Sequence, residues 1–316
     1  MAKKKKKVAV KGPDSVGTKQ RPVHTEILVR PIHRGVNDIG SWRSALRLAD
    51  LGNRTKLYDL FTDLLIDGYL SDAIDKRIDA VTDADLAFTI DGKQVDEMDA
   101  LMDTPEFESL LREIMLSRFW GVSLVECLFL DGFGFKSIPR KHIRTKTKEI
   151  AIREEDEHGI PYADNDLIIQ FGSDDDFGIL LRAAPFVIYK RGGFGDWAQF
   201  VELFGMPQRI GKYSSMDEQS RRALIQAFEE AGSAPYLVIP KETEATQTTL
   251  SSSGNGALYN DFRNACNEEI LITVLGQTMT TQDGSSLAQG QVHMAVQEKK
   301  HRADRRFVER MLNKYF

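Results

Sequence analysis

The sequence predicts an α+β fold in which two long helices flank a small inserted α/β module. Apolar residues recur at every fourth position in the region 258–274, which places one apolar stripe along a helix: Leu258, Phe262, Cys266, Ile270 and Val274. A second helical pattern occupies residues 185–204. Between them lies a small module with a strand–helix–strand–strand pattern, at about residues 206–252. The ends of this inserted module must meet, so we expect the two helices to lie close together.

The N-terminal unit, residues 24–180, is predicted to mix helices and strands. We expect helices at residues 41–51, 55–81 and 105–120, the last starting with a proline at its first position after Thr104. We expect strands at residues 24–32, 122–130, 134–138, 149–152 and 167–171, and a hairpin at 86–95 around Asp91-Gly92.

The second half is predicted to alternate long helices with short connections. A helix at 185–205 is stopped by Gly205 and Pro207, with Gly192-Gly193 as a candidate bend. The module at 206–252 reads as strand 207–213, a helix opened by a Ser215–Glu218 capping box, and strands 236–239 and 243–250. A helix at 257–275 follows, capped by Gly276. After the polar segment 276–286, a long helix runs over 287–316 from a Ser286–Gln289 capping box.

Charge divides the 316-residue chain into a basic arm and an acidic body. Seven lysines against Asp14 give residues 1–19 a charge of +6, so the remainder carries −11 if the total is −5. We expect residues 1–23 to be a disordered arm whose Lys3, Lys4, Lys5, Lys6 and Lys7 bind DNA or an acidic partner. The negative charge of the body would repel DNA rather than bind it.

Several function classes are disfavoured by the sequence. Cys127 and Cys266 are predicted to be buried thiols in a reducing compartment, and no apolar run is long enough for a membrane span or a signal peptide. Residues 12–19 resemble a phosphate-binding loop, but Lys19 falls one place late. His293 and His301 are two helical turns apart, too far to share a metal. We therefore expect no enzyme activity, no metal and no cofactor.

Two rival hypotheses remain open. The acidic triplet Asp174, Asp175 and Asp176 could belong to the metal site of a head-associated nuclease, although adjacent carboxylates do not converge on one ion without other ligands. Alternatively, the lysine arm at residues 3–7 could make the chain a capsid- or DNA-binding adaptor.

Two sequence blocks carry a resemblance to a known family. Residues 196–213 read DWAQFVELFGMPQRIGKY, and residues 275–288 read LGQTMTTQDGSSLA, followed by Gln291-Val292-His293. In this order they resemble the portal proteins of phage Mu and Mu-like prophages. The resemblance extends from about residue 182 to the end of the sequence. Relatives continue past the equivalent of Leu312-Asn313, so we expect the chain to be truncated within its last helix.

The resemblance implies a portal-like fold that assembles into a ring, usually of twelve copies, at one vertex of the phage head. Residues 24–180 would be the wing, 185–205 and 257–275 the paired stem helices, 206–252 the clip, 276–286 the tunnel loop, and 287–316 a long wing or crown helix. The tunnel-loop residues expected to face DNA are Thr278, Thr280, Thr281, Gln282, Asp283, Gly284 and Ser285. The expected partners are further copies of the chain, double-stranded DNA, the terminase large subunit, the major capsid protein and a head–tail adaptor. The expected location is the virion, after assembly in the bacterial cytoplasm.

Overall fold

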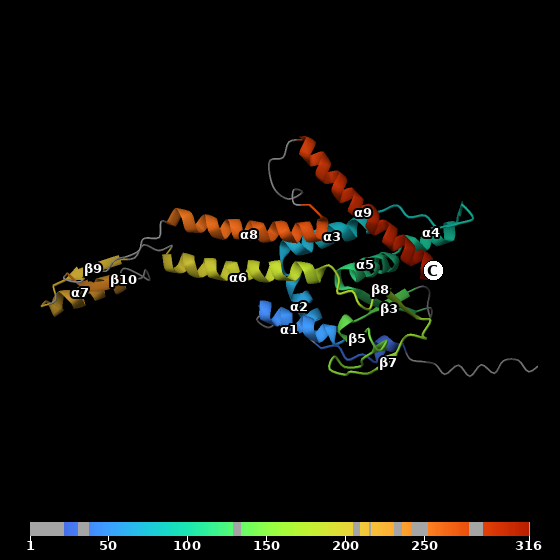
Figure 1. Cartoon of the computed structure of the whole chain (residues 1–316), viewed down its shortest axis with the longest axis horizontal. Helices are drawn as coiled ribbons and strands as arrows, with labels where there is room; N and C mark the ends of the chain where they lie inside the picture. Colours follow the sequence, from blue (N-terminus) through green and yellow to red (C-terminus); the bar gives the residue numbers. More distant parts are fainter. Residues whose placement is uncertain are drawn as a thin grey trace, which may run out of the picture.

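Two long antiparallel helices extend from one side of a mixed α+β body and carry a small module at their far end (Figure 1). The computed structural model describes residues 22–30, 38–128, 134–204, 209–214, 216–230, 236–241, 252–277 and 287–315. The long helices are α6 (Leu180–Phe204) and α8 (Ser252–Leu275). The α+β class predicted from the sequence is confirmed.

Five helices build the first part of the body, and polar side chains define where several of them begin. They are α1 (Ile39–Asp50), α2 (Thr55–Leu64), α3 (Gly68–Thr82), α4 (Asp96–Met102) and α5 (Pro105–Trp120). The side chains of Asp38, Asp67 and Thr104 each accept a backbone N–H from three residues further on, which caps α1, α3 and α5. The Thr104-Pro105 helix start is therefore confirmed.

The single helix predicted over residues 55–81 is wrong, because the chain turns at residues 65–67 and forms α2 and α3 instead. Asp67 explains the break: its side chain accepts the N–H of Leu70 at 3.1 Å and starts a new helix. The same carboxylate pairs with Lys190 of α6 at 2.7 Å. Apolar periodicity continues through the turn because both helices face the same core, so the pattern alone conceals the break.

The main sheet has three antiparallel strands in the order β4 (Gly134–Ile138), β3 (Val122–Leu128) and β8 (Ile168–Gly172). Residues 122–127 of β3 are all buried, as expected for a central strand covered on both faces. A second small sheet contains β5 (Ile143–Arg144), β6 (Glu149–Ile150) and β7 (Ile160–Pro161). The predicted hairpin at Asp91-Gly92 is confirmed by β1 (Thr89–Ile90) and β2 (Lys93–Gln94).

The strand predicted at residues 24–32 is wrong over its described part, residues 24–30. The chain instead forms a single 3-10 turn, η1 (Val23–Thr25), followed by irregular backbone. Glu126 on β3, which is 3% exposed, accepts the N–H groups of Val23 at 2.6 Å and His24 at 3.0 Å. A buried carboxylate needs such donors, and satisfying it holds the turn against the sheet.

Helix α6 is longer than the sequence predicts. It starts at Leu180, includes Pro185 in its second turn, and continues through Gly192-Gly193 without interruption. Gly193 has a packing role, because a Cβ at this position would lie 2.9 Å from the Phe262 ring of α8. The glycine therefore allows the two helices to approach closely.

The far module is a parallel strand pair joined by a helix: β9 (Arg209–Tyr213), α7 (Glu218–Glu230) and β10 (Tyr236–Pro240). Strand, helix and strand follow in the predicted order. The cap of α7 comes from Asp217, which accepts the N–H of Ser220 at 2.9 Å. Ser215, the residue predicted for this role, and the strand predicted at 243–250 lie outside the described residues.

Helix α9 (Leu287–Tyr315) crosses α3 and α5 and ends on the main sheet, and its predicted length is confirmed (Figure 1). The Tyr315 hydroxyl donates to the Gln170 carbonyl at 3.0 Å. The Tyr315 ring meets Phe171 of β8 edge to face, with centroids 5.8 Å apart. The end of the described chain is therefore packed against the sheet of the N-terminal body.

Gly121→Ala is expected to destabilise the body strongly. Gly121 ends α5 at φ +90°, and a Cβ there would lie 2.1 Å from the Asp176 carbonyl oxygen. We expect a loss of at least about 2 kcal/mol in the free energy of unfolding, measured by urea denaturation. Gly195→Ala is the matched control, because that position lies within α6 with open space around it. It should be neutral or stabilising by up to about 1 kcal/mol, and equal effects of the two substitutions would contradict this account.

Candidate functional site

The residues predicted to face DNA, Thr278 to Ser285, and the lysines at 3–7 lie outside the described residues. The structure does describe both ends of the segment 278–286. Helix α8 ends at Leu275, and Gly276 adopts φ +78° with its N–H directed to the carbonyls of Ile272 at 2.9 Å and Leu271 at 3.2 Å. The glycine cap predicted from the sequence is therefore confirmed.

Gln277 extends this fixed end by one residue. It is 5% exposed, and its Nε2 donates to Oε1 of Gln297 on α9 at 2.9 Å. A residue predicted to belong to a polar loop is thus buried between α8 and α9. The side-chain bond ties the last described residue before segment 278–286 to the first half of α9.

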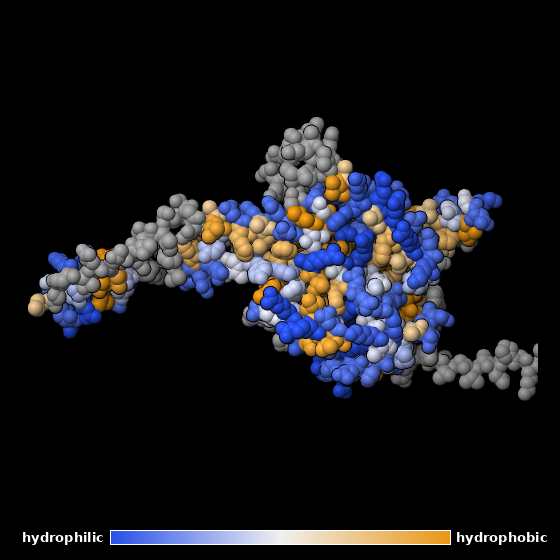
Figure 2. Space-filling model, in the orientation of Figure 1, coloured by the Kyte–Doolittle hydropathy of each residue, from blue (hydrophilic) through white to orange (hydrophobic). Residues whose placement is uncertain are grey.

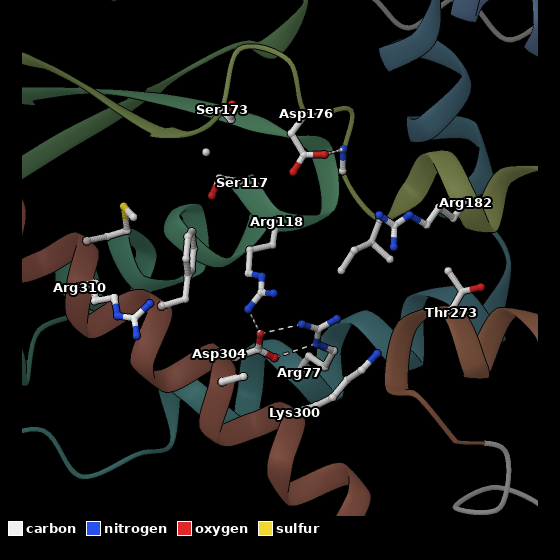
Figure 3. Close-up of a pocket in the computed structure, with 16 residues that line it drawn as sticks. Arg77, Ser117, Arg118, Ser173, Asp176, Arg182, Thr273, Lys300, Asp304 and Arg310 are labelled. Atoms are coloured by element: carbon white, nitrogen blue, oxygen red, sulfur yellow. Dashed lines mark hydrogen bonds and ion pairs between the residues drawn. The ribbon is translucent and has the colours of Figure 1, made fainter.

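A buried ion cluster holds α9 against the body close to this junction (Figure 3). Asp304 of α9 is fully buried and accepts Nε and Nη2 of Arg77 on α3 at 2.8 and 2.6 Å. Nη1 of Arg118 on α5 donates to the same carboxylate at 2.6 Å. Because the arginines come from two different helices, Asp304 joins α3, α5 and α9 at one point. We call these three residues the Asp304 cluster.

The Asp304 cluster also reaches the C-terminal end of α8. Nη1 of Arg77 donates to the Val274 carbonyl at 3.0 Å, and Nζ of Lys300 donates to the same oxygen at 3.2 Å. Cations at this end complement the helix dipole and satisfy a carbonyl that has no partner inside the helix. Burial, and then the neighbouring Arg77 guanidinium, lower the pKa of Lys300. The α8 end of segment 278–286 is therefore attached to this charged junction.

The second functional feature is an exposed apolar surface on the paired helices, visible as orange patches along the extension in Figure 2. It consists of large side chains that are 43–66% exposed: Tyr189, Phe194 and Val201 on α6, and Leu258, Phe262 and Ile272 on α8. Large apolar side chains exposed together on one pair of helices often mark a contact with another macromolecule. We call it the helix-pair surface.

Asp174 and Asp176 of the acidic triplet make contacts that organise the local structure. The Asp174 carboxylate binds Nζ of Lys148 at 2.6 Å and Nε2 of Gln170 at 2.9 Å. Asp176 accepts the N–H of Gly178 at 2.8 Å, which organises the turn before α6. Within the described ranges, no three His, Cys, Asp or Glu side chains are grouped closely enough to hold a metal ion. These carboxylates have structural partners instead.

The other candidate reactive groups are also held in structural positions. Cys127 and Cys266 are free and buried, and burial raises the pKa of both thiols, which makes them poor nucleophiles. Burial lowers the pKa of His301, and the side chain of His293 lies outside the described residues. Each helix that the structure describes is too short or too polar to cross a lipid bilayer.

The Asp304 cluster and the burial of Gln277 are not apparent in the sequence. Arg77 and Asp304 are 227 positions apart, and neither lies in a recognisable motif. The only local signal is that both charged residues occur within one helical turn of core residues, Arg77 beside Ile78 and Asp304 one turn before Val308. A charge in such a position needs a buried partner, but the sequence does not identify that partner.

Comparison with known proteins places the chain among phage proteins. A family model described as the portal protein of Mu bacteriophage matches residues 58–316. The portal protein of Escherichia phage Mu is 29% identical over 133 residues, which cover 41% of this chain and 26% of that protein. The Mu-like prophage FluMu protein gp29 of Haemophilus influenzae is 29% identical over 124 residues, covering 38% of this chain and 24% of the relative. The matches thus span about a quarter of the length of these curated relatives.

Asp304→Asn is expected to destabilise the junction of α3, α5 and α9. The substitution leaves two guanidinium groups without a counter-charge, and losing one partner of a buried ion pair costs about 3–5 kcal/mol. Urea denaturation measures the effect. Glu298→Gln is the control on the same helix, because Glu298 pairs with Arg305 at the surface and should contribute no more than about 1 kcal/mol. A similar small loss for both variants would mean that the Asp304 cluster does not hold α9 in place.

Proposed function

The chain belongs to the family of portal proteins of Mu bacteriophage, and from that membership we propose that it forms a ring at the capsid vertex. The ring would be the channel through which DNA is packaged and later ejected. In this role the protein positions other molecules mechanically and needs no catalytic residue.

The observation that supports this proposal most is the arrangement of α6 and α8. They form an antiparallel rod with the small β9–α7–β10 module at one end and the start of segment 278–286 at the other (Figure 1). A subunit of this form suits a ring, because rods can stand side by side around a bore. The module and segment 278–286 would then lie at different heights along the channel.

The proposed parts of the subunit follow from this arrangement. Residues 24–180 would be the wing, α6 and α8 the stem, and residues 206–252 the clip. Helix α9 would lead back across the wing, toward a crown. The residues of the clip would present a surface to the terminase large subunit and to a head–tail adaptor, while the wing would meet the major capsid protein.

The helix-pair surface would form the contact between neighbouring subunits. Val201 is 51% exposed and Leu258 is 66% exposed, at the outer half of the rod, where the body does not cover them. In a closed ring each subunit presents one surface to the next, so every copy of this apolar patch would be covered at once. We propose a ring of twelve copies in the virion.

Segment 278–286 would project toward the bore as a tunnel loop. Thr278, Thr280, Thr281, Gln282 and Ser285 offer neutral polar groups, and Asp283 adds a negative charge. Such groups would touch DNA without neutralising its phosphates, so that the duplex can slide. The fixed position of Gly276 and Gln277 would set the direction in which the loop leaves the stem.

Ring assembly tests the proposal directly. Purified protein is expected to form rings in negative-stain images, with a bore wide enough for duplex DNA. The variant Val201→Asp/Leu258→Asp should reduce ring formation at least tenfold, since it places charges in an apolar contact, while leaving circular dichroism unchanged. The control Leu51→Asp changes a residue that is 78% exposed on the body and should leave the rings intact. Finding only monomers in the wild type at all concentrations would refute the proposed function.

Gly284→Trp tests the tunnel-loop assignment separately. The substitution adds a large side chain to a loop proposed to surround DNA, so rings should assemble normally while packaging of DNA into heads falls. A DNase-protection assay of packaged DNA would measure this effect, and Gly192→Trp on the exposed side of α6 is a size-matched control. Full DNA filling of heads carrying the Gly284 variant would contradict the assignment.

A further inference from the structure

A pocket of about 720 Å³ lies next to the Asp304 cluster, bounded by α9, α5, the turn before α6, and the end of α8 (Figure 3). Five cationic side chains line it: Arg77, Arg118, Arg182, Lys300 and Arg310. The carboxylates in its lining are Asp176 and Asp304. The pocket lining therefore carries a formal charge of +3 within a body whose overall charge is negative.

The negative charges in the pocket are already engaged. Asp304 is bound by Arg77 and Arg118, and one oxygen of Asp176 accepts the N–H of Gly178. Among the described residues, no carboxylate pairs with Arg182 or Arg310, and both are exposed to the pocket opening. Lys300 bonds to a neutral carbonyl. Arg182 of α6 and Lys300 of α9 thus line the same part of the pocket, and Arg310 lines it farther along α9.

The geometry of the surrounding elements adds to the positive potential. Figure 3 shows Arg182 reaching into the pocket from α6, on the side where Lys300 lies, while Arg310 lies apart from them farther along α9. Gly178 and Ile179, which immediately precede α6, also line the pocket, so the N-terminal end of this 25-residue helix is directed toward it. Helix N-termini favour anions because their first N–H groups lack partners within the helix.

The pattern favours phosphate over a single carboxylate. Guanidinium groups bind phosphate through paired, charge-assisted hydrogen bonds, and a phosphate group presents several acceptor oxygens in different directions. One carboxylate has a single charge and two oxygens in one plane, so it offers fewer acceptors to Arg182 and Lys300 than a phosphate does. Phe307 and Met311 form an apolar side of the pocket that limits competition from water.

We propose that this pocket is a phosphate-binding site in which Arg182 and Lys300 hold the anion at one end, the Asp304 cluster positions Lys300, and Arg310 adds positive charge farther along α9. The phosphate could belong to a DNA backbone or be free in solution. The DNA source rests on the proposed portal function, because segment 278–286, which leaves α8 beside the pocket, would then face the channel. The pocket itself does not depend on that function.

Binding of inorganic phosphate tests the site on the full chain. At constant ionic strength, replacing chloride with phosphate should raise the thermal unfolding midpoint, since a ligand that binds only the folded state stabilises it. Arg182→Gln/Arg310→Gln should weaken binding measured by calorimetry at least about tenfold, because one charge-assisted contact and one further positive charge of the pocket are lost. Neither residue takes part in a described ion pair, so the variant should fold normally.

Arg302→Gln/Arg306→Gln is the matched control. Arg302 and Arg306 are exposed residues of the same helix α9, and the substitution removes the same charge outside the pocket. The control should bind phosphate as the wild type does. If wild-type protein shows no phosphate binding, or if both variants lose it equally, the proposed site is refuted and the cations are instead a general surface charge or a contact for another subunit.

A short labelled DNA duplex distinguishes the two sources. If backbone phosphates enter the pocket, inorganic phosphate should compete with the duplex, and the pocket variant should lower the slope of log affinity against log salt by about 1–2 relative to the control. If phosphate binds at the pocket and the duplex does not compete, free phosphate is the ligand. Negative-stain images of the same samples report the ring separately. Phosphate binding without rings would support the site and contradict the portal function. Rings without phosphate binding would support the portal function and contradict the site.

Discussion

The buried carboxylate of Asp304 is the contact on which the arrangement of the long helices depends. It accepts three hydrogen bonds from two arginines on different helices, and one of those arginines also caps α8. Burying these charged groups away from water is costly, and only complete hydrogen bonding compensates for that cost. Small displacements of α9 would leave a charge unpaired in the interior, so the cluster tolerates few alternative packings. It thus specifies where α9 lies more than it adds to net stability.

A second, similar pair fixes the base of the rod. Lys190 of α6 and Asp67 of α3 are 8% and 7% exposed at the side chain and lie 2.7 Å apart, with the ammonium 4.7 Å from the Tyr69 ring centroid. Asp67 also caps α3, so the orientation of that helix and the position of α6 are set by one carboxylate. Together with the Asp304 cluster, this pair anchors α6, α8 and α9 to α3. The outer half of the rod has no such contacts with the body, which is where the helix-pair surface is most exposed.

Local features were predicted well from the sequence and long-range ones were not. The Gly276 cap, the Thr104-Pro105 helix start and the Asp91-Gly92 hairpin were predictable because each depends on a few adjacent residues. The break at Asp67 was missed because apolar periodicity continues through it, and the strand expected at 24–32 was wrong because buried Glu126 draws residues 23–24 into a turn. The Asp304 cluster and the cationic pocket join residues from distant helices, which no local pattern reveals. The tunnel-loop and lysine-arm residues stay predictions, since they lie outside the described part of the chain.

The cationic pocket and the neutral segment beside it suit different demands within the proposed ring. A conduit needs weak contacts along the path of DNA, because the free energy of every phosphate contact must be overcome as the duplex advances. A few cations set back in a pocket can meet this demand if each site binds weakly. In a ring, however, identical sites act together, and linked weak contacts can hold a ligand far more tightly than one site does. The pockets of the ring would then contribute little to DNA binding while DNA is driven through the channel, and more when the duplex is stationary. Raising the salt concentration would weaken the binding of the stationary duplex.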